Sequence, residues 1–344
     1  MTVRLPLVSV SELRSFRRCP REHRLAYGLG IRPIEAARTQ RFGTLVHKGL
    51  EAWWKAVPGA RLHAALSAVA ELGDPYERVK AEIMLAGYDA RWGDVDMEVL
   101  HVEAEFRAPL VNPATGAASR TYELGGKLDA VARIGGRVWI VEHKTSSEDI
   151  SPGSDYWRRL RLDAQVSTYF VGARALGLEP TGCLYDVLGK PTIRPSQVPV
   201  LDEEGTKIVL DAQGQRVRTK DGKKWRESAS SGDGYVLQTR AETPDEFGER
   251  LAAAIEKDPE AYFQRGEVHR LKSDEDDAAA DTWATARSIR EAETLRRWPR
   301  NPDACVRYGN TCAYWDVCTG VARTDDTTKF RTIHTKHEEL QAHG

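Results

Sequence analysis

Apolar residues recur every three to four positions along most of the chain up to residue 93, which predicts amphipathic helices. Ser9 or Ser11 can cap the first of them, because a side-chain oxygen there accepts a hydrogen bond from a free backbone N–H. Pro20 interrupts the pattern directly after Cys19, so two short helices are expected to meet at this cysteine. The helical segments expected in this part are residues 8–30, 41–56 and 60–93, the last divided at Pro75.

From residue 97 the period shortens to two, which is typical of half-buried strands. Two further apolar runs flank Gly135-Gly136, a pair that favours a β-hairpin turn. The expected strands are residues 97–109, 121–134, 137–145 and 181–189, and a helix over 156–177 separates the last two. This order predicts an α/β protein with a mixed sheet and a crossover helix.

Residues 190–240 differ from the rest of the chain because they are rich in Gly, Ser, Lys and Arg. This composition predicts an inserted polar hairpin or a mobile flap. Beyond it, Thr243 can cap a helix over residues 243–257, and a strand over 261–272 and a helix over 274–297 are expected. No internal repeat is expected. Within one compact domain, the expected parts are an N-terminal helical region (1–95), a strand-rich core (96–189), the insertion or flap (190–240) and C-terminal helices with a cysteine cluster (241–344).

The chain has 344 residues, of which 41% are hydrophobic and 29% charged, as in a soluble globular protein. No apolar run reaches the length of a membrane span, and the first residues lack the continuous apolar core of a signal peptide. A cytoplasmic protein without membrane partners is therefore expected. The net charge of −1 does not indicate a globally basic nucleic-acid binder, so any basic surface must be local.

The predicted hairpin over residues 125–147 carries three charges where a core strand is normally apolar. Glu142 and Lys144 flank His143, so they share one strand face, and pairing across the turn can bring Asp129 to the same end. Two carboxylates form a hard oxygen site suited to Mg²⁺ or Mn²⁺. A lysine beside them can orient an attacking water or stabilise negative charge on a phosphate. The alternative interpretation is a cross-strand salt bridge on a solvated face.

Four motifs in this order resemble the RecB-type branch of the PD-(D/E)XK nucleases: Gly43 with His47, Gly126-Lys127-Leu128-Asp129, Glu142-His143-Lys144, and Gln165 with Tyr169. This family includes the nuclease domains of RecBCD and AddAB helicase–nucleases, CRISPR-associated RecB-like exonucleases and stand-alone phage nucleases. The resemblance extends from about residue 8 to 320, apart from 190–240, and Leu128-Asp129 stands where the family usually has Pro-Asp. It implies a restriction-endonuclease-like fold, with a mixed central β-sheet flanked by helices.

The resemblance also implies roles for these residues. The implied ligands of Mg²⁺ or Mn²⁺ are His47, Asp129, Glu142 and the backbone carbonyl of His143. Lys144 would position the nucleophilic water, and Gln165 and Tyr169 would contact DNA or brace the active site. The implied activity is that of a Mg/Mn-dependent deoxyribonuclease, an exonuclease acting on single- or double-stranded DNA ends in recombination, repair or phage DNA metabolism. It would act in the cytoplasm of a bacterium or of a phage-infected host.

Three of the five cysteines, Cys305, Cys312 and Cys318, lie close together in the sequence. An odd number of cysteines in a chain expected to be cytoplasmic argues for a metal or cluster rather than disulfides, with Cys19 as the candidate fourth ligand. The iron–sulfur branch of the RecB-type family places one cysteine before the nuclease core and three after it, so the resemblance implies a [4Fe–4S] cluster joining the chain ends. Zn²⁺ on the same thiolates, or free buried cysteines, are the alternatives. Cys183 is expected in the core.

DNA contact requires local positive charge, and aromatic residues can stack on the bases of single-stranded DNA. Trp225 lies among lysines and is a candidate for such stacking. The expected DNA contacts are Arg158, Arg161, Lys223, Lys224 and Trp225, besides Gln165 and Tyr169; further basic candidates are Arg14, Arg17, Arg18, Arg21, Arg159, Lys220, Arg226, Arg265 and Arg270. The alternative for each is an ordinary solvated face.

Two other functional classes compete with the nuclease. A catalytically silent DNA-binding or assembly module with a structural metal cluster would have no use for the Glu142–Lys144 pair, which is retained. A thiolate redox protein would need a reactive pair such as CxxC, which is missing. No Walker A motif occurs, so the chain is expected to be free-standing or to work beside a separate helicase or recombinase. No oligomeric state is predicted.

Overall fold

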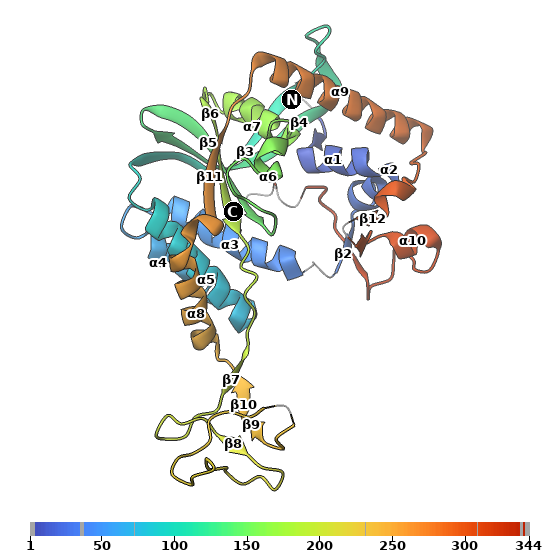
Figure 1. The fold of residues 1–344 in the computed structure, drawn as a ribbon. Coiled ribbons are helices and arrows are strands. Elements are labelled where there is room, and N and C mark those ends of the chain that lie inside the picture. The colour runs from blue at the N-terminus through green and yellow to red at the C-terminus, as the bar shows by residue number, and fades with distance from the viewer. Residues whose placement is uncertain are drawn as a thin grey trace.

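The computed structural model describes residues 4–34, 38–71, 73–230, 232–307, 309–337 and 340. A six-stranded mixed sheet forms its centre, in the order β1-β4-β5-β6-β11 with β3 paired to β4 (Figure 1). Strand β4 is antiparallel to β3 and β5, whereas β5 and β6 are parallel. The strands are β1 (Leu7–Val8), β3 (Met97–Val111), β4 (Ala118–Ile134), β5 (Arg137–Ser146), β6 (Gly182–Gly189) and β11 (Phe263–Val268). The predicted hairpin and crossover are therefore confirmed.

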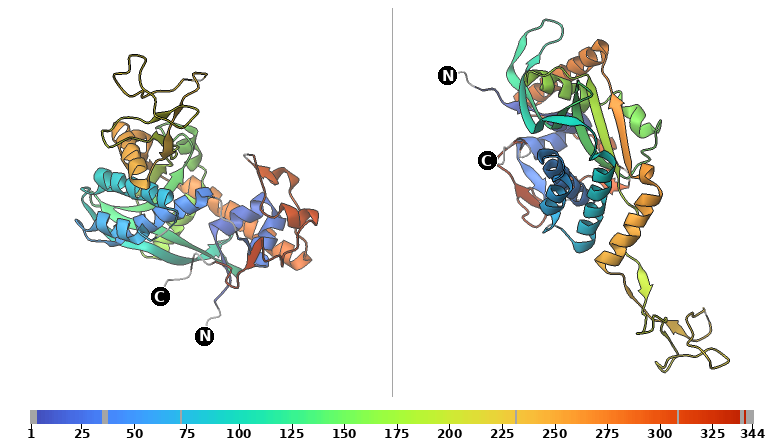
Figure 2. Two further views of the ribbon diagram at one scale, coloured as in Figure 1. Left: turned by 90° about the horizontal axis from the view of Figure 1, so that it is seen from below. Right: turned by 90° about the vertical axis from the view of Figure 1, so that its left-hand side faces the viewer.

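Helices cover both faces of this sheet (Figures 1 and 2). On one face, Leu50, Trp53 and Trp54 of the helical region pack against β-sheet residues such as Val141. On the other face, Phe170 lies in a second apolar cluster with core residues of β4, β5 and β6. The helices are α3 (Arg38–Lys55), α4 (Arg61–Val69), α5 (Pro75–Trp92) and α8 (Pro244–Lys257) on the first face, and α6 (Asp155–Leu160) and α7 (Ala164–Ala175) on the second. This is the layered arrangement of a restriction-endonuclease-like fold.

The two ends of the chain pack against each other beside the sheet (Figure 2). Short strands from the two ends pair antiparallel, and the N–H of Ile333 donates to the carbonyl of Gly30 at 2.8 Å. Cys19 separates two short helices, as the sequence predicts, and Ser9 caps the first one. The elements of this region are α1 (Val10–Arg18), α2 (Pro20–His23), a π-helical turn (Arg24–Gly28), β2 (Ile31–Pro33), α9 (Lys272–Leu295), β12 (Val306–Arg307), β13 (Asn310–Thr311), α10 (Trp315–Thr319) and β14 (Phe330–Thr332).

The single helix predicted over residues 156–177 is wrong, because the chain breaks between α6 and α7. Asp163 caps α7 by accepting the N–H of Gln165 at 2.7 Å. Arg270, on the segment after β11, donates to the carbonyls of Leu160 and Asp163 at 2.8 and 2.9 Å. A guanidinium more than 100 residues away therefore supplies the hydrogen bonds that a continuous helix would have made internally.

Residues 196–242 form a projecting arm, which stands clear of the sheet and its helices (Figure 1). Its stalk is β7 (Gln197–Pro199) paired with β10 (Thr239–Ala241), followed by β8 (Val209–Leu210) with β9 (Val236–Leu237). The buried carboxylate of Glu242 accepts the N–H of Ser196 at 2.7 Å and a guanidinium N–H of Arg250 on α8 at 2.9 Å. The insertion is thus a β-structured arm whose base is anchored to the body.

The arm contains a short repeat, so the expectation of no internal repeat is wrong on this scale. The segments LDEEGTK and LDAQGQR build the same turn, closed by bridges from Leu201 to Lys207 and from Leu210 to Arg216. In each, one aspartate oxygen accepts two backbone N–H groups inside the turn.

Among the described helices, none is both long and apolar enough to cross a membrane.

Candidate active site

The charged residues at the end of β5 divide between the two faces of the sheet. Glu142 and Lys144 project toward α7, where Lys144 Nζ forms an ion pair with Glu142 Oε1. Gln165 Nε2 on α7 donates to the same oxygen at 3.2 Å and also contacts the hydroxyl of Tyr169. The ring of His143 points the opposite way, toward α3 and α5. The alternation predicted from strand periodicity is confirmed.

Asp129 joins this end of the sheet from β4. Its Oδ2 accepts the backbone N–H of His143 at 2.9 Å and lies 3.9 Å from Nδ1 of His47 on α3. Gly43, one turn before His47, lets α3 approach the strand end, since a Cβ there would lie 3.1 Å from Thr145 Oγ1. Elements β4, β5, α3 and α7 thereby bring together the sequence-predicted residues His47, Asp129, Glu142, His143, Lys144, Gln165 and Tyr169.

The electrostatics of these groups are strongly perturbed. Burial, helped by the neighbouring Asp129, raises the pKa of Glu142 to about 7. Burial also acts to raise the pKa of Asp129, but the hydrogen bond from His143 and electrostatic interactions with His143, His47 and Lys144 hold it well below its usual range. Burial lowers the pKa of His47 to about 4, so its imidazole is neutral at physiological pH. The site thus combines an ionised carboxylate, a carboxyl poised near neutrality and a neutral imidazole.

The donor chemistry of this site fits a divalent cation. Glu142 Oε2 is buried and accepts no hydrogen bond from a described residue, while Oε1 is engaged by the ammonium of Lys144. Carboxylate oxygens and a neutral imidazole are ligands that Mg²⁺ and Mn²⁺ accept. As the side chains stand, no three His, Cys, Asp or Glu side chains in the described part of the chain are grouped closely enough to enclose an ion.

A buried polar network lies behind His143. The Tyr88 hydroxyl donates to Asp186 Oδ2 at 2.7 Å and stands 3.5 Å from His143 Nε2. Arg265 pairs with Asp186, and its guanidinium lies 3.9 Å from the ring centre of Trp92. The expectation that Arg265 contacts DNA is therefore wrong, because its charge is used inside the protein. An aspartate within the apolar strand segment CLYDVLG was the sequence signal for this network.

The four cysteines predicted to act together line one small cavity of about 30 Å³. Cys19 comes from the junction of α1 and α2, and the N–H of Cys312 donates to the carbonyl of Cys305 at 2.8 Å. None of the four forms a disulfide in the described part of the chain, and burial raises the pKa values of Cys312 and Cys318. Four thiols around one cavity have the donor chemistry of a thiolate-bound metal or cluster, but as the described side chains stand they do not enclose an ion. Cys183 is fully buried in the core instead.

The predicted DNA contacts lie in two separate places. Arg158 and Arg161 are exposed at the end of α6, just before α7 with Gln165, and Arg158 pairs with Asp155 at 3.3 Å. Lys223 and Lys224 are exposed on the arm, away from the sheet. The Trp225 ring is not open for stacking as it stands, because two guanidinium groups, those of Arg216 and Arg218, lie 4.3 and 4.2 Å from its centre.

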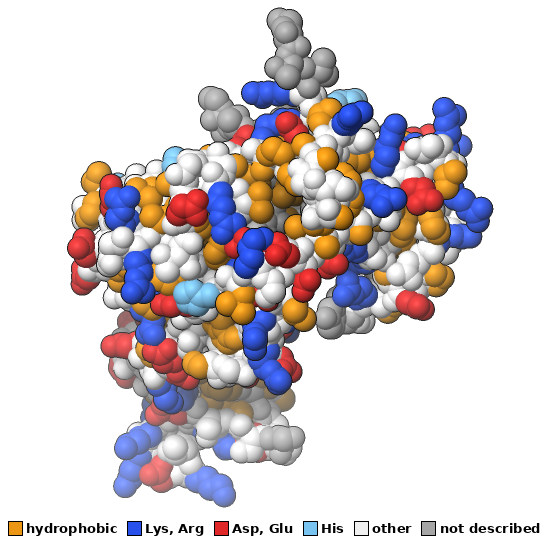
Figure 3. Space-filling model, turned by 90° about the horizontal axis from the view of Figure 1, so that it is seen from above, with side chains coloured by type: hydrophobic (Ala, Val, Ile, Leu, Met, Phe, Trp, Pro, Cys, Tyr) orange, Lys and Arg blue, Asp and Glu red, His pale blue; other side chains and the backbone are white. Residues whose placement is uncertain are grey.

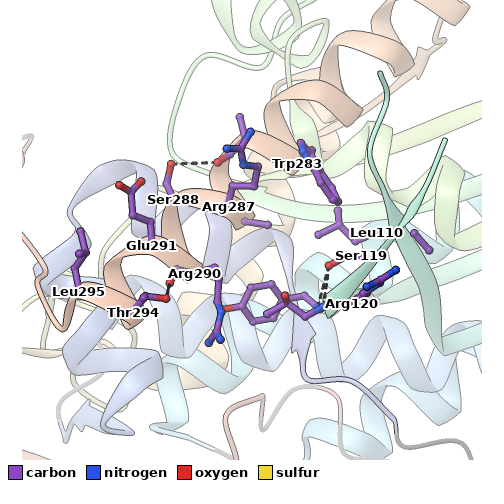
Figure 4. A pocket seen from close by; sticks show the side chains of 15 residues that line it. Leu110, Ser119, Arg120, Trp283, Arg287, Ser288, Arg290, Glu291, Thr294 and Leu295 are labelled. Atoms are coloured by element: carbon purple, nitrogen blue, oxygen red, sulfur yellow. Dashed lines mark hydrogen bonds between the residues drawn. The ribbon is translucent and has the colours of Figure 1, made fainter. Parts of the chain in front are cut away.

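A wide groove of about 900 Å³ lies between α9 and the β3–β4 hairpin (Figure 4). It is lined by Arg120, Trp283 and Arg287, among others. Asp129 lies seven positions after Tyr122 of the groove wall, or about 23 Å along the strand, so the groove is separate from the candidate active site. On the upper face, Lys and Arg side chains are interspersed with Asp and Glu and do not form one continuous basic surface (Figure 3).

An α/β fold that presents Asp129, Glu142 and Lys144 at the adjoining ends of two central strands is the arrangement of a restriction-endonuclease-like nuclease. Comparison with protein families agrees: the model of the PD-(D/E)XK nuclease superfamily matches residues 7–319. The chain belongs to this superfamily, which confirms the resemblance seen in its motifs.

Two solved structures are similar to the chain. The crystal structure of SSO0001 matches with 16% identity and a TM-score of 0.26, over 55% of this chain and 65% of that one. A protein from Eubacterium rectale described as a candidate exonuclease matches with 12% identity and a TM-score of 0.31, over 75% and 83%. The matched region thus spans less than two thirds of SSO0001. No curated protein sequence is significantly similar to the chain.

Proposed function

We propose that the protein is a divalent-metal-dependent deoxyribonuclease that hydrolyses phosphodiester bonds at DNA ends. One observation carries the proposal: Asp129, Glu142 and Lys144 meet at the ends of β4 and β5, with the neutral His47 beside them. Membership of a nuclease superfamily supports it. Such an enzyme would act in recombination, repair or phage DNA metabolism. A separate helicase or recombinase would prepare its DNA substrate.

His47, Asp129, Glu142 and the carbonyl of His143 would hold Mg²⁺ or Mn²⁺. When bound, the ion supplies Lewis-acid charge at the scissile phosphate. Glu142 must be ionised to take part, and its pKa of about 7 means that protons compete with the cation near neutral pH.

Lys144 acts on the water and on the phosphate. Burial favours its neutral amine, but the carboxylates of Glu142 and Asp129 outweigh this effect and raise its pKa, so it stays protonated. Its ammonium can donate to the attacking water and offset the negative charge that develops on the phosphate. Gln165 keeps Glu142 in place through its 3.2 Å hydrogen bond. The chain therefore supplies both the positioning group and its support.

The four clustered cysteines would bind a [4Fe–4S] cluster, with Zn²⁺ as the alternative, and thereby join the two chain ends. Arg158 and Arg161 would hold phosphates beside the catalytic residues. Lys223 and Lys224 would contact DNA at a distance from the cut, through the arm. Trp225 would stack on a base only after Arg216 and Arg218 move from its ring.

The test is cleavage of linear and circular DNA, single- and double-stranded, by protein purified without oxygen and supplied with Mg²⁺ or Mn²⁺. Lys144→Ala is the inactive variant, and Lys55→Ala, an exposed lysine paired with Glu51 on α3, is the matched control. Degradation of linear DNA alone, lost only in Lys144→Ala, is the expected result. Cleavage of circular DNA would show that the activity is that of an endonuclease and not of an exonuclease. DNA binding without any cleavage would favour the silent binding or assembly module.

A further inference from the structure

Leu162 is an unusually exposed apolar side chain close to the catalytic residues. It lies in the turn between α6 and α7, and 92% of its surface is exposed, more than any other large hydrophobic residue in the described chain. Three positions later, Gln165 donates to the catalytic Glu142. Three residues span at most about 10 Å, so Leu162 stands near Gln165 at the margin of the active site. A single exposed leucine is ordinary on a protein surface. Leu162 differs because the turn that carries it is held by hydrogen bonds from Arg270.

The turn that carries Leu162 is held on both sides. The guanidinium of Arg270 donates to the carbonyls of Leu160 and Asp163, the residues that flank the tip of the turn. The Asp163 carboxylate also pairs with Arg14 of α1 at 3.1 Å. The tip is thus tied to two distant parts of the chain while the Leu162 side chain projects into solvent. A pre-positioned apolar group loses little conformational freedom when it meets a ligand.

Leu162 also forms a ridge between two hollows. Together with Arg159, it lines a cavity of about 250 Å³ on the α1 side and another of about 980 Å³ on the α6 side. Arginines line both: Arg14 and Arg17 in the first, and Arg158, Arg161 and Arg270 in the second.

The acidic residues in these hollows are already engaged. Asp163 bonds Arg14 and Asp155 pairs with Arg158, so these two arginines are partly neutralised, as Arg159 is by Glu148. Glu267 lies 3.1 Å from the ring of His269, and Asp274 accepts the N–H of Leu271 at 2.9 Å. Arg161 has no ion-pair partner among the described residues, so its charge is open to an anion. A basic hollow on each side of an apolar ridge is suited to two phosphate backbones with bases between them.

We propose that Leu162 is a wedge that inserts at the end of a DNA duplex and separates the strands beside the catalytic centre. The proposal rests on the proposed function and narrows its substrate to duplex ends. An apolar side chain pushed between bases replaces part of the stacking that is lost, and the flanking arginines neutralise the phosphates that are drawn in on either side. One strand is then delivered to Glu142 and Lys144, and the other is held away from them.

The experiment compares Leu162→Ala with Leu295→Ala, an equally simple change at a leucine that is 65% exposed at the end of α9. Each is assayed on a blunt duplex and on one of its strands alone. A 2-aminopurine base at the duplex end reports unstacking by its fluorescence, measured with Lys144→Ala as the background so that no DNA is cut. Leu162→Ala should slow duplex cleavage about tenfold more than single-strand cleavage and abolish the fluorescence rise, and Leu162→Met should restore both. Leu295→Ala should change neither.

Equal losses on both substrates, or a fluorescence rise that persists in Leu162→Ala, would overturn the wedge. So would a wild-type enzyme that degrades only single strands, and in these cases the nuclease proposal stands. A protein that opens duplex ends but cuts no DNA would keep the wedge and overturn the nuclease. A protein that neither binds nor cuts DNA would overturn both.

Discussion

Asp129 on β4 accepts a hydrogen bond from the backbone N–H of His143 on β5, at 2.9 Å. Regular backbone pairing between β4 and β5 ends at Ala130 with Val141. Beyond this pair, the side chain of Asp129 links the two strands. A main-chain group thereby fixes the Asp129 carboxylate beside the strand that carries Glu142. Substitutions at position 143 other than proline should leave this hydrogen bond in place, because the backbone N–H and not the side chain donates it.

Glu142 should make the stability of the metal-free protein depend on pH. Its pKa is raised from 4.5 to about 7 in the folded state, so its stabilising effect is complete below about pH 4.5 and is lost as pH rises to about 7. The loss is about 3 kcal/mol. Glu142→Gln should flatten this part of the stability profile and abolish cleavage. Urea unfolding from pH 4 to 8 in chelator measures it, and parallel profiles would contradict the assignment.

Glu12 should give a pH dependence of the opposite sign. Burial acts to raise its pKa, but hydrogen bonds from His23, His337 and Lys336 lower it from 4.5 to about 2. Its contribution is therefore present above about pH 4.5 and is lost as pH falls toward 2, a change of about 3 kcal/mol. Glu12→Gln should remove this acid-sensitive part.

The Glu12 measurement is unfolding by urea between pH 2 and 6. Glu249→Gln, which changes an exposed carboxylate on α8, is the control and should follow the wild type. If the wild-type stability did not fall between pH 6 and pH 2, the prediction would be wrong. The contacts of Lys336 and His337 with Glu12 would then not hold the C-terminal segment to α1.

Cys312→Ser should lower the iron or zinc content and the thermal stability together, because it removes one thiol from the cavity that joins the chain ends. Cys183→Ala is the matched control, since Cys183 lies in the sheet core and outside that cavity. It should keep the full metal content. Metal analysis and melting curves of anaerobically purified protein measure both effects. Unchanged metal content in Cys312→Ser would contradict a thiolate-bound group.

Asp186→Ala should destabilise the protein by about 3–5 kcal/mol, because it leaves the inward-pointing Arg265 without its partner. The double variant Asp186→Leu with Arg265→Met should recover most of this loss, since it removes both charges. Denaturant unfolding of Asp186→Leu, of Arg265→Met and of the double variant gives the coupling energy. If the two single changes were simply additive, the Asp186–Arg265 pair would not be the stabilising unit.

Local periodicity is enough to predict several features of the site. The alternation of a strand places Glu142 and Lys144 on one face and His143 on the other, and the Gly135-Gly136 turn brings β4 back beside β5. These features follow from covalent geometry and near neighbours. The order and spacing of the motifs around them are sufficient to indicate the nuclease family.

Other features depend on residues far apart in the sequence. At the break between α6 and α7, Arg270 binds the carbonyls of Leu160 and Asp163 from more than 100 residues away. Arg265 was expected to face DNA, yet it turns inward because Asp186 stands on the neighbouring strand. No local pattern encodes such partners, because a side chain chooses between solvent and interior according to what the packed fold places opposite it. The sequence by itself therefore determined the strand faces and the catalytic motif, and the tertiary structure decided which charges remain free to meet a substrate.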